Sequence, residues 1–285
     1  MKIKFQKKFR AQSGLTLVEM MVATTLLVVI MLGLTAMFNQ VQRAFRGGLK
    51  QVDVFEGGRA IMDLVARDVE QLTASKDTNN WSLYAGMQAD TYLTSLNPTG
   101  TAPFRTNVLD ELFLLNYASD WSAIGYRVLN PQDLNNFNNL KFGTLYRFST
   151  NNFVGFRFPT NYYFNNLFNS GNAGLLLTNG YLSRVADGVV HFKVTFYDAA
   201  GFVTTNGTKG VSFLNPQPSV DLTNEFQIAY SGDALPSLVE IELGVLEPQT
   251  LEQARSMADP TSYLQKQGGK IHIFKQQIPI RNAPR

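Results

Sequence analysis

The hydrophobic pattern begins with an uninterrupted apolar run near the N-terminus. Residues 15–38 carry no charged side chain except Glu19. In a helix that rises about 1.5 Å per residue, this run extends roughly 36 Å, enough to cross a hydrocarbon core of about 30 Å. A lone carboxylate inside such a segment costs about 2.5–3.5 kcal/mol, so it is usually retained for a function. The run therefore predicts one transmembrane helix, with Glu19 as its candidate functional residue.

The helical pattern continues beyond the apolar run. Apolar positions recur every three or four residues, which is typical of an amphipathic helix. The predicted stripe consists of Val52, Phe55, Arg59, Met62, Ala66, Val69 and Leu72. Glycine pairs at 47–48 and 57–58 interrupt it, and each glycine costs about 1 kcal/mol in a helix interior. We expect one long helix in which the glycines permit bending or local melting. The alternative is one helix that ends at the first glycine pair and a second that begins near Val52.

From residue 76 the pattern changes to short alternating segments separated by Asn, Gly and Pro. Such alternation predicts antiparallel strands with one buried and one wet face. The expected strands are 111–118, 123–129, 144–149, 153–158, 189–197, 239–243 and 271–273, and the expected helix is 250–257. In two of the strands the alternation places His191 and His272 on the wet face, and Ile271 and Ile273 on the buried face.

These patterns predict an α+β protein. A long N-terminal α-helix, half transmembrane and half amphipathic, would pack on an antiparallel β-sheet head. The expected segments are a leader at 1–14, the transmembrane helix at 15–38, its amphipathic continuation at 39–75 and a β-rich head at 76–285.

The excess of positive over negative charge is confined to the N-terminus of the chain. The first fourteen residues carry five cations and no acid, at Lys2, Lys4, Lys7, Lys8 and Arg10. Removing these five charges from the formal net charge of +3 leaves about −2 for the rest, so no nucleic-acid partner is expected. Cations before an apolar run hold the N-terminus in the cytoplasm, and the head then faces outward. The absence of cysteine excludes disulfides and thiolate chemistry.

The order of residues around Glu19 resembles the class III signal of type IV pilins and type II secretion pseudopilins. A basic leader ends at Gly14, and Leu15-Thr16-Leu17-Val18-Glu19 opens the apolar run. The resemblance implies that a prepilin peptidase/methyltransferase cuts after Gly14 and methylates Leu15. It further implies that Thr16 and Glu19 act in filament assembly, with Glu19 paired to the N-terminus of a neighbouring subunit. Leu15 departs from the pattern, since Phe or Met is more common there. A plain uncleaved anchor is the alternative, but it does not explain Glu19.

Later segments resemble the J-type minor pseudopilins and the related W-type minor pilins. The similar segments are 59–68, 124–128 with 145–147 (a tyrosine followed by a leucine-x-arginine), 186–197 and 236–241. Segments 76–107 and 130–172 have no counterpart there and are interpreted as insertions. The resemblance implies a type IV pilin-like fold, and as neighbours I- and K-type minor pseudopilins and the major pseudopilin. The tip-most K-type subunit usually lacks the glutamate, so Glu19 argues against that role.

We therefore expect a minor pseudopilin of a type II secretion system. It would be a single-pass protein of the inner membrane, with the N-terminus in the cytoplasm and the head in the periplasm. It would support protein export at or near the tip of a short filament. One alternative is a minor pilin that primes a type IV pilus for adhesion, motility or DNA uptake. The other is a membrane-anchored periplasmic binding protein or enzyme.

Candidate catalytic and metal chemistry is sparse. The sequence has only two histidines and no G-x-S-x-G, H-E-x-x-H or glycine-rich phosphate loop, so neither an enzyme nor a cofactor is expected. Asp133, Asn135 and Asn138 weakly resemble a calcium loop. Asn138 occupies the glycine position and Thr144 the position of the bidentate glutamate, so a solvated loop is expected. The aromatic segment 153–168 is expected to be buried, with a partner or glycan surface as the alternative.

Overall fold

A computed structural model describes residues 16–95, 103–117, 120–132, 134, 140–151, 164, 168, 177–204, 211–213 and 227–281. The chain divides into two compact units, 1–50 and 51–285, which are described separately. Helix α1 (Leu17–Glu70) contributes residues to both units. It passes both glycine pairs without a break, so the single-helix prediction is confirmed.

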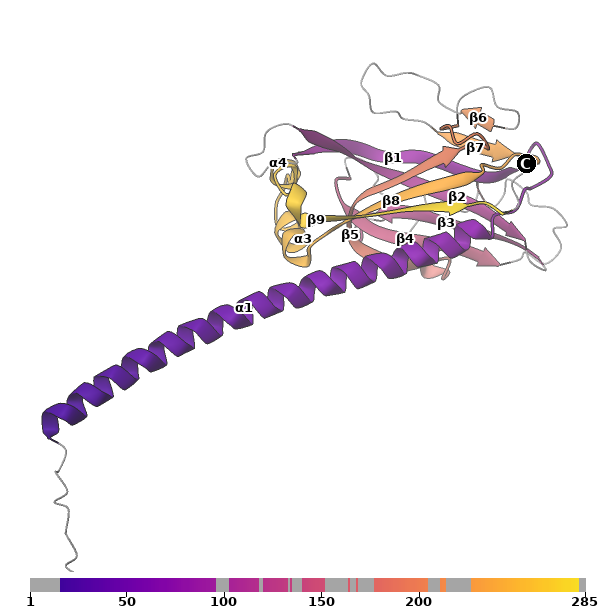
Figure 1. Cartoon of the computed structure of the whole chain (residues 1–285). Helices are drawn as coiled ribbons and strands as arrows, with labels where there is room; N and C mark the ends of the chain where they lie inside the picture. The colour runs from indigo at the N-terminus through magenta and orange to yellow at the C-terminus, as the bar shows by residue number, and fades with distance from the viewer. Residues whose placement is uncertain are drawn as a thin grey trace, which may run out of the picture. The chain divides into compact units, whose positions relative to one another are not determined.

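The second unit contains one large β-sheet. Its strand order within the described residues is β6-β7-β1-β2-β3-β4-β5-β8-β9 (Figure 1). The strands are β1 (Trp81–Ser95), β2 (Phe104–Tyr117), β3 (Trp121–Leu129), β4 (Gly143–Asn151), β5 (Leu182–Tyr197), β6 (Val211–Phe213), β7 (Ile228–Ser231), β8 (Leu238–Leu246) and β9 (Ile271–Pro279). These neighbours all pair antiparallel, and β2 makes one further parallel pairing with β5. A long helix followed by an antiparallel sheet is the predicted α+β, type IV pilin-like fold.

Most predicted elements of the head are present. Strands β2, β3, β4, β5, β8 and β9 and helix α3 (Pro248–Arg255) coincide with predicted segments, whereas 153–158 lies outside the described residues. Strands β1, β6 and β7, the short helix α4 (Thr261–Gln265) and the 3-10 helix η2 (Gly268–Lys270) were not predicted. Strand β1 lies in the segment interpreted as an insertion, yet it pairs with both β2 and β7 and so belongs to the sheet.

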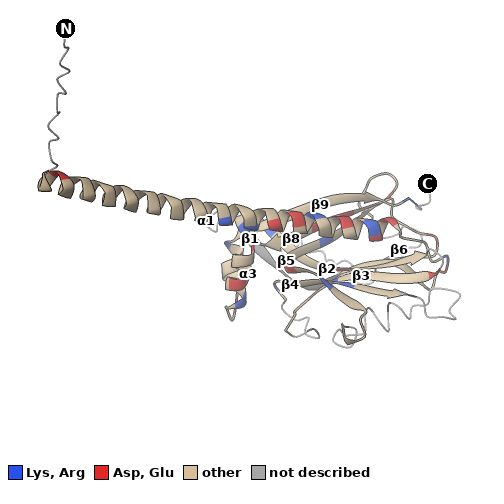
Figure 2. Ribbon diagram, turned by 90° about the horizontal axis from the view of Figure 1, so that it is seen from below, with Lys and Arg blue, Asp and Glu red and all other residues tan. Residues whose placement is uncertain are grey.

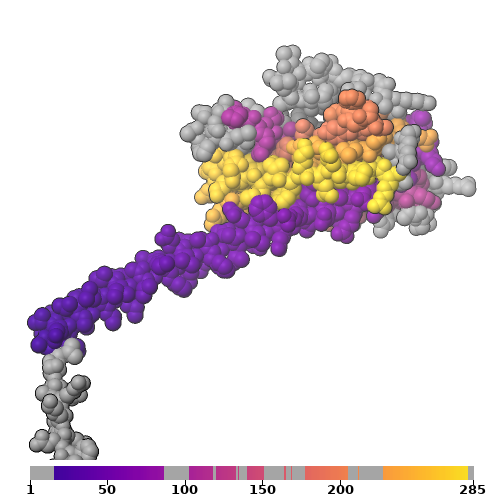
Figure 3. All heavy atoms as spheres, viewed as in Figure 1, coloured from indigo at the N-terminus to yellow at the C-terminus, as the bar shows by residue number. Residues whose placement is uncertain are grey.

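The later part of α1 supplies one wall of the main core. Met62, Val65, Ala66 and Val69 are buried against residues of the sheet. The predicted stripe is therefore correct from Met62 onward, but Val52, Phe55 and Arg59 are exposed. Gly58 is buried instead, because the ring of Phe274 on β9 occupies the place where a side chain would project. Figure 3 shows the C-terminal strand, in yellow, lying along this part of the helix.

A second core covers the opposite face of the sheet. Phe164 and Phe168 are buried there, in contact with the rings of Phe113 and Phe148. Gly125 on β3 makes room for Phe168, since a Cβ at this glycine would lie 2.4 Å from the Phe168 ring. At these two positions the aromatic segment is buried, as expected.

The wet-face predictions for the histidines are wrong. His191 is only 2% exposed, because β2 runs beside β5 at this position and covers it. In β9 the alternation has the opposite phase: His272 and Phe274 both contact Phe55 of α1, and Ile273 is exposed. Ile271 is buried, but in a separate cluster beneath α3 and α4. Both faces of β9 are therefore partly covered, one by α1 and the other by α3 and α4. Simple alternation cannot show which of the two faces is the more buried one.

Candidate assembly site

In the first unit, the described residues form an exposed apolar helix. Large apolar side chains from Leu17 to Leu49 lie on its surface, most of them more than half exposed. The helix is long and apolar enough to cross a membrane. Glu19 is the acid in the first turn of α1. Figure 2 shows that charged residues line the part of α1 within the second unit, whereas the stretch after the first turn is uncharged.

The threonines of this span do not leave hydroxyl groups without partners. Thr24 and Thr25 donate to the carbonyls of Met21 and Val22, at 3.0 and 2.8 Å, and Thr35 donates to Met31 at 2.8 Å. Each bond returns to the preceding turn, so no partner outside the helix is required. This arrangement suits a helix surrounded by hydrocarbon, where an unpaired polar group is costly.

Thr16 and Glu19 form a capping box at the start of α1. The Glu19 amide donates to the Thr16 hydroxyl oxygen at 3.3 Å. In return, the Glu19 carboxylate accepts from the Thr16 amide at 2.9 Å and from its hydroxyl at 3.0 Å. A T-x-x-E sequence satisfies two of the amides that a helix start leaves without partners. The two predicted assembly residues are therefore in contact, whereas Gly14 and Leu15 lie outside the described residues.

The capping box gives Glu19 a role within its own chain. A carboxylate in the first turn interacts favourably with the positive end of the helix dipole. The Glu19 side chain is exposed, and its hydrogen-bond donors among the described residues, both from Thr16, contact the same oxygen, Oε2. The side chain is thus held at the helix start while Oε1 remains available to a cation from outside.

In the head, a buried polar contact joins three distant segments. Asp68, near the end of α1, accepts a 2.5 Å hydrogen bond from the Tyr126 hydroxyl. Arg147 on β4 donates to both oxygens of the same carboxylate, from Nε at 2.7 Å and from Nη2 at 3.0 Å. Bidentate geometry of this kind is among the stronger charge-assisted contacts in proteins.

The chemistry of this contact follows from its burial. Asp68 and Tyr126 are 6% and 0% exposed, and the Arg147 side chain is 22% exposed. Desolvation raises the pKa of the Tyr126 hydroxyl, so it remains a hydrogen-bond donor. The hydrogen bond to Asp68 raises the pKa of the Arg147 guanidinium. The contact therefore holds the end of α1 against β3 and β4 through a largely buried ion pair and a hydrogen bond.

A second buried ion pair lies on the opposite face of β3. Arg127 follows Tyr126 and so points away from α1, where it donates to Glu111 at 2.8 and 2.5 Å. The same guanidinium donates to the carbonyl of Phe168 and lies 4.7 Å from the centre of its ring. Consecutive residues of one strand therefore contact α1 on one face and Phe168 on the other.

The structure offers little support for metal chemistry among the residues it describes. No group of three or more His, Asp or Glu side chains is arranged there to hold an ion. Thr144 donates to Asp187 at 2.7 Å, and Asp133, Asn135 and Asn138 lie outside the described residues. The role of Asp68 was not predicted. The spacing of Tyr126, Arg147 and Asp68 in the sequence gives no sign of their contact.

Comparison with known families gives one match. Residues 9–35 match the family model described as the prokaryotic N-terminal methylation motif. No significant match to a curated protein is found. The matched residues include Gly14, Leu15, Thr16 and Glu19. The motif implies processing by a prepilin peptidase, and the single apolar N-terminal helix fits an inner-membrane anchor.

Proposed function

The chain carries a class III prepilin signal and is a type IV pilin-like protein, and we propose that it is a J-type minor pseudopilin of a type II secretion system. In this proposal, the peptidase cuts after Gly14 and methylates Leu15. The mature subunit then enters a short periplasmic filament at or near its tip and supports protein export. Its partners are I- and K-type minor pseudopilins and the major pseudopilin.

The main support for the J-type assignment is that Tyr126 and Arg147 both bind Asp68. Asp68, Tyr126 and Arg147 come from three of the short segments that resemble J-type subunits. Each segment alone is a weak resemblance. Their meeting in one buried contact gives the resemblance a physical basis, because Tyr126 and Arg147 both donate to the Asp68 carboxylate. W-type minor pilins share these segments, so the choice of filament depends on the experiment below.

The proposed orientation rests on charge. Five cations precede the apolar run, and cations flanking a span are retained in the cytoplasm. The head then lies in the periplasm. The same orientation places the bond after Gly14 at the cytoplasmic side of the membrane, where the peptidase would cut it.

The capping box supports the proposed role of Glu19 in assembly. Before assembly, the Thr16 amide and hydroxyl stabilise the carboxylate, which lowers the cost of keeping it in the membrane. During assembly, the methylated amine of a neighbour would approach the remaining oxygen. The attraction of opposite charges in a medium of low dielectric constant then favours a single register between subunits.

The mass of the mature protein tests the processing step. The full chain is produced with and without prepilin peptidase and analysed by intact mass spectrometry. The expected product lacks residues 1–14 and carries one added methyl group only when the peptidase is present. An intact leader in both samples would contradict the proposal and favour a membrane-anchored periplasmic binding protein or enzyme.

A deletion strain tests the choice of filament. Secretion of exoproteins is measured in parallel with surface piliation, motility and transformation. Loss of secretion with normal piliation is the expected result. Normal secretion with lost piliation would instead identify a minor pilin that primes a type IV pilus. Complementation with Glu19→Ala should restore membrane insertion but not filament assembly, whereas normal filaments would contradict the pairing of Glu19.

A further inference from the structure

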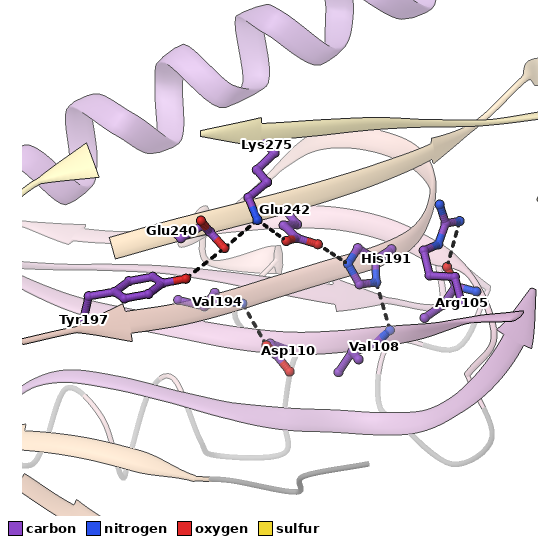
Figure 4. Close-up of polar contacts among 10 residues, drawn as sticks. Arg105, Val108, Asp110, His191, Val194, Tyr197, Glu240, Glu242 and Lys275 are labelled. Carbon is purple, nitrogen blue, oxygen red and sulfur yellow. Dashed lines mark hydrogen bonds and ion pairs between the residues drawn. The ribbon is translucent and has the colours of Figure 1, made fainter. Parts of the chain in front are cut away.

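The sheet closes on itself where β2 and β5 meet. Their backbones pair in parallel at a single position, Leu109 opposite Phe192. On either side of this pair, a side chain replaces the backbone as hydrogen-bond acceptor. His191 Nδ1 accepts from the Val108 amide at 3.0 Å, and Asp110 Oδ2 accepts from the Val194 amide at 2.8 Å (Figure 4). We call these two bonds and the pair between them the β2–β5 junction.

Asp110 is a buried carboxyl group without an ion-pair partner among the described residues. It is 9% exposed, and within the described part of the chain its carboxyl group accepts a hydrogen bond from the Val194 amide. The positive charge of Lys193 on β5 lowers the pKa of Asp110, and the negative charge of Glu111, its neighbour on β2, raises it. An ionised carboxylate in such a site is costly because one amide replaces its hydration shell.

His191 fixes the other half of the junction. Since Nδ1 accepts a hydrogen bond, the ring is neutral and carries its proton on Nε2, which lies 3.3 Å from the Glu242 carboxylate. Glu242 on β8 is also bound by Lys275 of β9, which bridges to Glu240. The charged groups around the imidazole are therefore already paired with one another, and Asp110 is the junction's unpaired acid.

We propose that the β2–β5 junction is a pH-sensitive latch, closed while the Asp110 carboxyl is protonated and loosened when it ionises. A protonated Asp110 still accepts the Val194 hydrogen bond through its carbonyl oxygen, without a buried charge. After ionisation, any opening that admits water to the carboxylate becomes more favourable. This inference concerns the head alone and holds whichever filament the protein joins.

The direction of the pH dependence follows from burial. Desolvation raises the pKa of Asp110 from 3.8 to about 7. In the open junction, the carboxyl ionises near its ordinary pKa. The closed state is therefore most favoured below about pH 4, and its advantage declines as the pH rises to about 7, above which it stays constant. The change is opposite in sign to that of a salt-bridged carboxylate.

Hydrogen exchange of the full chain in detergent micelles tests the latch. Peptides from 104–117 and 182–197 are compared at pH 5 and pH 8, after correction for the intrinsic pH dependence of exchange. We expect protection in both to fall at least tenfold at pH 8, whereas peptides from the β3–β4 pair, 121–151, keep theirs. In Asp110→Asn, which keeps an acceptor but cannot ionise, the fall should be less than twofold. An equal fall in both proteins, or none in the wild type, would overturn the proposal.

Two further measurements guard against ambiguity. The carboxyl ¹³C resonance of Asp110 in the wild type should titrate near neutrality, and a midpoint near pH 4 would refute the latch even if the variant failed to fold. His191→Gln keeps an acceptor at the other bond and removes the imidazole. The pH dependence of protection from exchange should be unchanged in this variant. Its disappearance would mean that His191, and not Asp110, controls the junction, and would overturn the proposal.

Discussion

The Tyr126 hydroxyl donates a 2.5 Å hydrogen bond to the Asp68 carboxylate, although 58 positions separate the two residues in the chain. Tyr126 is fully buried, so water cannot replace Asp68 as its partner. The same carboxylate receives two bonds from Arg147. Asp68 is therefore the residue through which the end of α1, β3 and β4 are held together.

Loss of Asp68 should destabilise the head strongly. Asp68→Ala leaves the Arg147 guanidinium without its ion pair and the Tyr126 hydroxyl without an acceptor. Breaking a buried pair from one side costs about 3–5 kcal/mol. We expect a decrease of this size in the free energy of unfolding, measured by urea titration with the fluorescence of Trp81 and Trp121.

Asp63→Ala is the matched control for this prediction. Asp63 is on the same helix but exposed, and such substitutions change stability by about 0.5 kcal/mol or less. Similar losses in the two variants would mean that the Asp68 contact contributes little.

The two adjacent glycines of α1 should respond in opposite directions to alanine. A Cβ at Gly58 would lie 2.2 Å from the Phe274 ring, whereas one at Gly57 would have no atom within 4 Å. Gly57→Ala should therefore stabilise the protein by up to about 1 kcal/mol through helix propensity. Gly58→Ala should destabilise it by about 1–3 kcal/mol through overpacking.

A second-site change distinguishes a steric cause from a change in helix flexibility. Phe274→Leu provides space beneath position 58, so Gly58→Ala should be better tolerated in that background. Thermal unfolding of the four combinations measures the coupling. Additive effects would argue against a clash at Phe274.

Removal of the Thr16 hydroxyl should loosen the first turn of α1. Thr16→Val keeps the shape of the side chain but removes the acceptor for the Glu19 amide and one donor to its carboxylate. Loss of an N-cap costs about 1 kcal/mol, which corresponds to roughly a fivefold faster exchange of the amides at 17–20. Thr16→Ser should exchange like the wild type. If the amides of Thr16→Val also exchange at the wild-type rate, the capping box does not stabilise the helix start.

Glu242 should make the head sensitive to strong acid. The hydrogen bond with His191 is the main cause that lowers its pKa from 4.5 to about 2, with Lys275 adding to it. The stabilisation is therefore complete above about pH 4.5 and is lost as the pH falls through about 2. We expect a loss of about 1–3 kcal/mol over this range, because the side chain is 25% exposed and the full shift is partly screened.

Comparison with Glu242→Gln separates the contribution of Glu242 to acid sensitivity from that of the other carboxylates. The variant should lose less stability than the wild type between pH 4.5 and pH 2 in urea titrations. Glu252→Gln, at an exposed position of α3, should retain the wild-type dependence. If Glu242→Gln and the wild type have parallel pH profiles, the carboxylate of Glu242 is not stabilised by its neighbours.

Local patterns in the sequence were sufficient to predict the N-terminal features. The length of the apolar run predicts a span because it depends only on helix geometry. The capping box of Thr16 and Glu19 is equally local, but it was not predicted. Six strands of the head and α3 were likewise visible as alternation between turn residues. The methylation motif at 9–35 is local for the same reason.

The tertiary structure decided what lies opposite each side chain. Alternation placed His191 on a wet face, but β2 crosses there and buries it beside Val108. Gly58 looked like a weak point in a helix, and it proves to be where Phe274 packs. Asp68 had no predicted role, and it joins α1 to β3 and β4. Spacing along the chain fixes contacts within a helix or strand, whereas contacts between elements 50 or more residues apart depend on how the sheet closes.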